Sequence, residues 1–264
     1  MTTANVVHGF DTARWALDNS FMVQLTDPGD PYEAACPFYL VEHPEGLVVV
    51  DTGLSHEMLD APAEYGQHGA AFMEAFLPAI EYGPETHPKA HLESAGYAPE
   101  EVDYVVMTHL HSDHAGHIDT FPDAEFLIQK RELRYANWPV PVQDVFYLEG
   151  DFDVLRSDAY DVTPLEGSYD VFGDGTVRTM PTPGHTPGQQ SVVVELSSGT
   201  VVLGGDIAHK QDGYDREHLA SFNWDLQTSI ETLRNVKAFV RENDADVYLT
   251  HDNEHIEAFE GGLR

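Results

Sequence analysis

Residues 108–117, with the sequence Thr-His-Leu-His-Ser-Asp-His-Ala-Gly-His, concentrate side chains that bind metal ions. They follow an apolar run at 102–107 that predicts a buried strand. Because side chains alternate along an extended segment, His109 and His111 point the same way and can bind one cation. If the chain then turns into a helix, Asp113 and His114 are directed elsewhere and can serve a second cation nearby. Imidazole and carboxylate together suit zinc and its first-row neighbours, so the segment predicts a metal site.

Three more potential ligands follow predicted strands elsewhere in the chain. His185 lies in a rigid Pro- and Gly-rich loop, Asp206 follows two glycines, and His251 follows the last predicted strand. If the strands share one direction in a sheet, all of these side chains converge at the same edge. Asp51 also ends a strand, and we expect it to brace its neighbours as a hydrogen-bond acceptor. The candidate metal ligands are His109, His111, Asp113, His114, His185, Asp206 and His251.

Strands and helices alternate along the chain, which indicates an α/β protein. Two stretches, at about 55–98 and 132–160, interrupt this alternation and are expected to be insertions, the first of loop and helix and the second irregular. Because no linker or repeat divides the sequence, we expect one domain over residues 1–264. Strands are predicted at 20–26, 38–41, 47–50, 102–107, 126–128, 169–172, 177–180, 191–195, 201–203 and 247–249, and helices at 69–80 and 226–240.

The charge of the chain is strongly acidic. It carries 46 acidic and 13 basic residues, a formal net charge of -33, and the acid is spread along the whole sequence. Such self-repulsion is tolerated where salt screens it, since the Debye length falls from about 10 Å at 0.1 M to about 3 Å at 1 M. We therefore expect a cytoplasmic protein of a salt-accumulating, halophilic organism. The few, scattered basic residues make nucleic acid an unsuitable partner.

Other features limit the setting of the protein. No apolar run approaches the roughly 18 residues of a membrane span, and the first residues lack the basic and apolar regions of a signal peptide. A single cysteine, Cys36, excludes an internal disulfide and an all-cysteine zinc site, and we expect its side chain to be buried. The sequence leaves the choice between a monomer and a homodimer open.

The motif His-x-His-x-Asp-His, the later Gly-His-Thr-Pro-Gly and Gly-Gly-Asp, and a near-terminal histidine resemble the metallo-β-lactamase superfamily over nearly the whole chain. The resemblance implies an αβ/βα sandwich, two mixed sheets flanked by helices, with the site at one edge. It also implies two divalent metal ions, with zinc as the default and manganese, iron or cobalt as alternatives. His109, His111 and His185 would bind one ion, and Asp113, His114 and His251 the other. Asp206 would bridge both.

Within that superfamily the chain resembles the quorum-quenching N-acyl homoserine lactone lactonases. The shared features are His-Leu-His-x-Asp-His-Ala-Gly, the loop at 182–188 followed by Gln-Ser at 190–191, and His-Asp at 251–252. This implies a metallohydrolase that opens a lactone ring of a small-molecule substrate with a metal-bridging hydroxide. Asp113 is expected to protonate the leaving alcohol. His209 stands where these lactonases commonly carry Tyr, and its ring can still donate a hydrogen bond to a carbonyl oxygen.

Other functions of the same fold remain alternatives. A glyoxalase-type thioesterase would need cationic contacts that the last third of the chain scarcely offers, and a cysteine-ligand β-lactamase would need a Cys near a later ligand. A diiron redox protein normally carries a flavin partner domain, for which the chain has no length. A non-enzymatic metal store is the last alternative, and the open site expected between long loops disfavours it, because a store does not need one.

Several other residues have a predicted environment. His117, which stands where a second Gly is usual, and His255 are expected behind the ligands or at the surface, and Gln189 replaces a common His. Trp138 and Phe146 are candidates for lining a substrate pocket. Phe72, Met73 and Phe76 are expected in the core, and solvated positions are expected for His8, His43, His56, His68, His87, His91 and His218.

Overall fold

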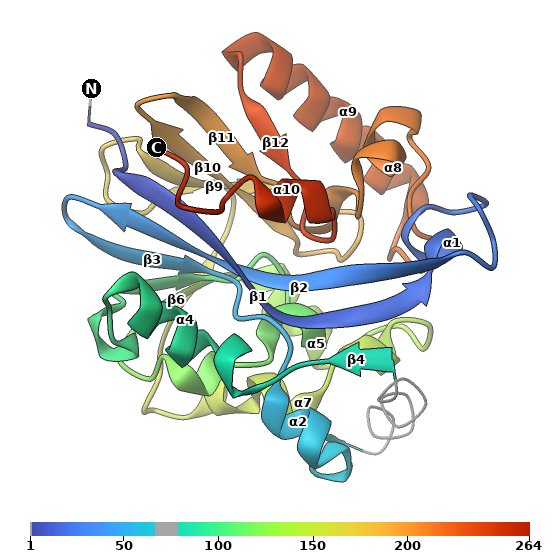
Figure 1. The fold of residues 1–264 in the computed structure, drawn as a ribbon, viewed down its shortest axis with the longest axis horizontal. Coiled ribbons are helices and arrows are strands. Elements are labelled where there is room, and N and C mark those ends of the chain that lie inside the picture. The colour runs from blue at the N-terminus through green and yellow to red at the C-terminus, as the bar shows by residue number, and fades with distance from the viewer. Residues whose placement is uncertain (1, 67–78) are drawn as a thin grey trace.

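Two β-sheets pack face to face, with helices on both outer faces (Figure 1). The computed structural model describes residues 2–66 and 79–264. The strands are β1 Val6–Asp18, β2 Pro31–His43, β3 Gly46–Val50, β4 Ile80–Glu81, β5 Tyr104–Val106, β6 Glu125–Gln129, β7 Asp161–Leu165, β8 Tyr169–Asp170, β9 Val177–Pro181, β10 Gln190–Leu196, β11 Gly199–Leu203 and β12 Asp246–Tyr248.

Both sheets are mixed. The first has the order β4-β1-β2-β3-β5-β6-β7, antiparallel from β4 to β3 and parallel from β3 to β7. The second has the order β12-β11-β10-β9-β8, in which only β11 and β12 are parallel. This arrangement confirms the predicted αβ/βα sandwich of two mixed sheets flanked by helices.

The helices cover the outer faces because each presents an apolar stripe. Leu233 and Val236 of α9 pack beside Ile207 and Leu249 at the five-stranded sheet, while Leu92 of α4 joins the cluster on the seven-stranded sheet. Valines of the two inner faces form the central core. The α-helices are α1 Asn19–Met22, α2 His56–Asp60, α4 Pro88–Ala95, α5 Ser112–Ala115, α6 Lys130–Ala136, α7 Glu149–Phe152, α8 Gln211–Arg216, α9 Leu226–Asn243 and α10 Asn253–Glu257.

The strands predicted from 38–41 onward and the helix predicted at 226–240 match the structure, the strand predicted at 20–26 is wrong, and β1 and β7 were not predicted. Residues 20–26 do not form a strand, because the Asp18 side chain accepts a hydrogen bond from Ser20 N and caps the short α1. The chain then turns through Leu25 and Asp27, both with positive φ. The region predicted to be irregular, 132–160, contains the end of α6, α7 and 3-10 turns. The predicted helix at 69–80, with Phe72, Met73 and Phe76, lies almost wholly outside the described residues.

In the part of the chain that the structure describes, no helix combines the length and the apolar character needed to cross a membrane.

Candidate metal centre

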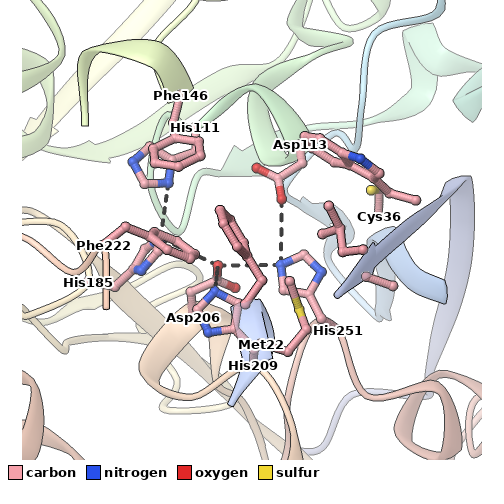
Figure 2. Close-up of a pocket in the computed structure, with 14 residues that line it drawn as sticks. Met22, Cys36, His111, Asp113, Phe146, His185, Asp206, His209, Phe222 and His251 are labelled. Atoms are coloured by element: carbon pink, nitrogen blue, oxygen red, sulfur yellow. Dashed lines mark hydrogen bonds and ion pairs between the residues drawn. The ribbon is translucent and has the colours of Figure 1, made fainter. Parts of the chain in front are cut away.

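The candidate ligands follow the carboxyl ends of strands from both sheets at one edge of the sandwich. His109 to His114 follow β5, and the other three candidates follow β9, β11 and β12. Their nitrogen and oxygen atoms form groups within 4.8 Å, and Figure 2 shows several of them facing a common pocket. The groups are His109 with His111 and His185, His109 with His114 and Asp206, and Asp113 with His114 and His251. The structure thus brings all seven candidates together, as the strand ends predicted.

Local structure divides the first motif into two directions. His109 and His111 belong to the extended stretch after β5, and their ring centroids are 4.6 Å apart. His111 has extended backbone angles and precedes the first turn of α5. Asp113 and His114 lie in that turn, where the Asp113 carboxylate approaches His251 Nε2 at 3.5 Å. The turn therefore separates the four ligand candidates into two pairs.

The loop that carries His185 is held by a buried carboxylate. Glu132 accepts hydrogen bonds from Leu110 N at 3.0 Å, Thr186 Oγ1 at 2.7 Å and Gly188 N at 3.2 Å. A Cβ at Gly188 would lie 2.2 Å from Glu132 N, so only glycine permits this approach. Glu132 thereby joins the loops of His109 and His185. Sequence reasoning missed it, because a glutamate in a short helix is an ordinary surface pattern.

Three of the histidine rings are oriented by an oxygen acceptor at their Nδ1 atom, whereas His111 Nδ1 lies 2.9 Å from His185 Nε2. His114 Nδ1 lies 2.8 Å from Asp51 Oδ2, His185 Nδ1 lies 2.9 Å from Asn223 Oδ1, and His251 Nδ1 lies 2.7 Å from the Ala35 carbonyl. A proton on Nδ1 leaves the lone pair on Nε2, which is the tautomer that binds a metal. Asp51 therefore has the bracing position expected from the sequence, although nothing in the sequence singled out Asn223.

Asp51 also controls the other half of the centre. Its Oδ1 accepts from Thr108 N at 2.7 Å and its Oδ2 accepts from Thr108 Oγ1 at 2.7 Å. The Thr108 hydroxyl in turn lies 3.1 Å from His109 Nδ1. Asp51 is 1% exposed and adopts a positive φ of 59°, a conformation that aspartate tolerates better than most residues. One buried carboxylate thus orients two rings.

The donor set fits divalent cations. Among the described residues, His109 Nε2, His114 Nε2 and Asp206 Oδ1 are buried without any hydrogen-bond partner. Such atoms are costly to bury unless another group satisfies them. Asp206 Oδ1 lies 3.4 Å from His114 Nε2, and its Oδ2 lies 3.4 Å from the Nε2 atoms of both His185 and His251. Its two oxygens therefore face both groups of rings.

Burial and mutual charge set the protonation of these groups. Burial, reinforced by the neighbouring imidazoles, lowers the pKa of His109 and His111 well below the ordinary value. Burial likewise lowers the pKa of His185 to about 4. Burial alone would raise the pKa of Asp206, but the facing His251 and other rings hold it well below its usual range. Burial opposes protonation of His114 and His251, but the Asp206 carboxylate outweighs it and raises the pKa of both. The rings of His109, His111 and His185 are therefore neutral, whereas His114 and His251 must lose a proton to bind a metal.

The His209 side chain lies among the same polar groups. Its Nε2 is 3.3 Å from Asp206 Oδ2, and its ring stacks on His251 with an interplanar angle of 14°. The side chain is 3% exposed, and within the described segments its Nδ1 has no hydrogen-bond partner. His209 is therefore buried beside the centre and retains one ring nitrogen for a further contact.

A pocket lined mostly by apolar side chains adjoins the centre and encloses about 500 Å³ of empty space, part of which is open to solvent. His111, Asp113 and Asp206 line one side of it. Phe146 is part of the lining, as predicted, whereas Trp138 is 89% exposed and lies elsewhere. The apolar lining consists of Trp15, Leu17, Phe21, Met22, Ala34, Cys36, Phe146 and Phe222.

The remaining histidines differ partly from expectation. His43 and His56 are buried at 5% and 8% exposure, so the prediction of solvated rings is wrong for them. His255 Nδ1 accepts a hydrogen bond from Leu249 N, which places this ring behind the last strand. His117 is fully buried, and Cys36 is buried as expected. His68 lies outside the described residues.

Comparison with known proteins agrees with the geometry. The model of the metallo-beta-lactamase superfamily matches residues 32–249. The chain belongs to this superfamily. It is 34% identical to the N-acyl homoserine lactonase AttM of Rhizobium radiobacter over 85% of this chain and 84% of that protein. It is 27% identical to an N-acyl homoserine lactonase of Bacillus cereus over 96% of this chain and 95% of that protein.

Two solved structures have the same fold. An N-acyl homoserine lactone hydrolase with the product N-hexanoyl-L-homoserine at its catalytic metal centre superposes with a TM-score of 0.81 at 24% identity, over 100% of both chains. AidC, a dizinc quorum-quenching lactonase in complex with a product, superposes with a TM-score of 0.68 at 13% identity, over 96% of this chain and 92% of that one.

Proposed function

We propose that this protein is a metal-dependent hydrolase that opens the lactone ring of N-acyl homoserine lactones. The observation that carries the proposal is the junction of the His and Asp cluster with the apolar pocket. A polar, reactive head group attached to an acyl chain matches such a site, because each methylene that the pocket buries contributes up to about 0.8 kcal/mol. The sequence similarity to N-acyl homoserine lactonases supports the same substrate class.

His109, His111 and His185 would hold one divalent cation, zinc being the first choice, with manganese, iron and cobalt as alternatives. Asp113, His114 and His251 would hold the second, and the two oxygens of Asp206 would serve both. When bound, two divalent cations lower the pKa of water and polarise a carbonyl oxygen, so that an ester opens without a nucleophilic side chain.

Two side chains of this chain then act on the substrate. Asp113 lines the pocket and is 19% exposed, so it can take a proton from the attacking water and return it to the ring oxygen, which leaves as an alcohol. His209 donates a hydrogen bond to the substrate carbonyl oxygen, where its charge increases during attack. Phe146 and Phe222 contact each other at a ring distance of 5.0 Å and pack along the acyl chain.

The pocket separates this proposal from its alternatives. A thioesterase for an anionic thiol conjugate needs cationic groups, and the described residues that line the pocket include no Lys or Arg. Cys36 also lines the pocket, but it is absent from the groups of potential metal ligands found in the described part of the chain, which disfavours a β-lactamase with a cysteine ligand. Turnover of an N-acyl homoserine lactone, a β-lactam and a thioester by one preparation tests the choice. Oxygen consumption by the iron-loaded protein would instead favour a redox function.

We also infer a cytoplasmic location in a salt-accumulating cell. The net charge of -33 and the absence of any cysteine besides the buried Cys36 support this inference. Molar KCl should raise the melting temperature, because it screens repulsion between the acidic side chains. The inference would be contradicted by a melting temperature that stays constant or falls when KCl is raised roughly 20-fold, from about 0.1 M to about 2 M.

A further inference from the structure

A second group of potential metal ligands lies outside the centre described above. Its members are Glu57 of α2, His87 at the start of α4 and His117 directly after α5, and their ligand atoms lie within 4.8 Å of one another. The three helices lie on the outer side of the seven-stranded sheet (Figure 1). Segments about 30 residues apart in the sequence thus meet at one point.

The distances in this group are those of ligands around an ion. Glu57 Oε2 lies 3.6 Å from His117 Nδ1, and Glu57 Oε1 lies 3.8 Å from His87 Nε2. Both distances are too long for hydrogen bonds. Two ligand atoms at about 2.1 Å from a tetrahedral zinc ion are separated by about 3.4 Å, so small side-chain movements suffice to bind one.

His117 is the strongest indication of a ligand. Its side chain is fully buried, and among the described residues neither ring nitrogen has a hydrogen-bond partner of good geometry, although the Leu54 backbone approaches the ring. Burial, together with the neighbouring His87 and His56, lowers the pKa of His117 well below the ordinary value, although the Leu54 carbonyl opposes this shift. The ring is therefore neutral at physiological pH and offers a lone pair.

The surroundings favour a cation. Asp151 is 4% exposed, and within the described segments both of its carboxylate oxygens lack a hydrogen-bond partner. Burial, followed by the charges of Asp119, Asp113 and Glu57, raises the pKa of Asp151 well above its ordinary value, so this carboxyl favours its neutral form. The negative charge beside the histidines comes from Glu57 and Asp119, both of which act on His87. Glu57 itself has a side chain that is 54% exposed, which provides an entry path from solvent.

We propose that Glu57, His87 and His117 bind a separate divalent cation, with zinc as the ion that suits two imidazoles and one carboxylate and with water as the remaining ligand. The ion joins α2 and the start of α4 to the end of α5, the helix that carries Asp113 and His114. His87 Nδ1 accepts a hydrogen bond from Lys89 N, so its proton resides on Nε2 in the metal-free protein. Binding at Nε2 moves that proton to Nδ1 and releases the Lys89 amide.

Metal content per chain tests the proposal. The full chain is loaded with Zn²⁺, dialysed and analysed by plasma mass spectrometry, beside the variants Glu57→Gln, His87→Ala and His117→Ala. His218→Ala, which removes an exposed histidine outside the group, is the matched control. Each of the three variants should hold one zinc fewer than the wild type and the control, since loss of a ligand weakens binding by more than the about 10- to 100-fold effect of an outer partner.

The difference between proteins is the measured quantity, so it does not depend on how many ions the other centre holds. Glu57→Gln alters a half-exposed side chain and keeps the test valid if His117→Ala fails to fold. Zinc should also shift the amide resonance of Lys89 in the wild type and leave it unchanged in Glu57→Gln. Equal zinc content in the wild type and all folded variants, or equal loss in His218→Ala, would overturn the proposal.

Discussion

Asp51→Asn is the substitution that isolates how the protein orients its metal ligands. The carboxylate accepts hydrogen bonds from Thr108 N, Thr108 Oγ1 and His114 Nδ1. An asparagine of the same shape keeps its oxygen on Thr108 N, because that amide can only donate. Its NH₂ group must then face His114 Nδ1, which becomes an acceptor. The ring proton moves to Nε2, the atom that faces Asp206 at 3.4 Å.

The expected result is a loss of metal affinity with little change in shape. Loss of an outer hydrogen-bond partner weakens metal binding about 10- to 100-fold, or about 1.4 to 2.8 kcal/mol. Competition with a chromogenic chelator measures the affinity of each ion. Asp51→Asn should weaken the ion held by His114 directly and the ion held by His109 through the Thr108 hydroxyl, which loses the same acceptor. Lactone turnover should fall in proportion to the ions lost.

The matched control is Asp103→Asn, which alters a carboxylate that accepts a hydrogen bond from Leu47 N at 2.8 Å, next to the β2–β3 hairpin. The control should keep wild-type metal affinity. If Asp51→Asn binds both ions as tightly as the wild type, the argument that this carboxylate fixes the tautomer of His114 is refuted.

Three further changes test other parts of the account. Asp113→Asn should lower kcat for lactones by about 100-fold and affect a thiolactone less, because a thiolate leaves without protonation; equal effects on both substrates would contradict the acid role. Phe222→Ala should lower kcat/KM for a decanoyl substrate about tenfold more than for a butyryl one. Trp138→Ala, which removes an exposed aromatic side chain, should leave kcat/KM unchanged for both substrates. The proposed role of Phe222 fails if Phe222→Ala and Trp138→Ala behave alike. Burial lowers the pKa of His185 to about 4 in the folded state, so this group contributes stability that is present above about pH 6.5 and lost as pH falls toward 4. After treatment with a chelator, the melting temperature of His185→Asn should therefore fall less between pH 6.5 and 4.5 than that of the wild type. A larger fall in the variant would contradict this reasoning.

Much of the centre could be predicted because its information is local. The spacing of His109, His111, Asp113 and His114 depends on one strand and one helical turn, and both form as their patterns indicate. Strand ends position the other candidates, because β9, β11 and β12 run in the same direction and their carboxyl ends meet at one edge of the five-stranded sheet.

The groups that were missed act across long sequence distances. Glu132 meets Gly188 only because α6 packs against the loop of His185, and Gln190 donates hydrogen bonds to the carbonyls of Met107 and Leu127 on the other sheet. Hydropathy and spacing carry no signal for such contacts. The cluster around His117 was missed for the same reason, because its members belong to three segments that only the fold brings together.

The strand predicted at 20–26 is wrong because a capping side chain overrode its β-branched and apolar composition. Asp18 accepts hydrogen bonds from Ser20 N and, eleven residues after it, from Gly29 N, so it closes a loop around α1. Met22, within this loop, faces the pocket. Local propensity therefore failed at a segment that shapes the proposed substrate site.

Acid release from N-acyl homoserine lactones tests the central claim most directly. The metal-loaded protein is assayed at high salt with a series of acyl chains while a pH-stat titrates the carboxylate that ring opening produces. The account predicts one equivalent of acid for each lactone consumed, loss of activity after chelation, and its return when zinc is added back. No acid release with any acyl chain from protein shown to hold its metal ions would contradict it.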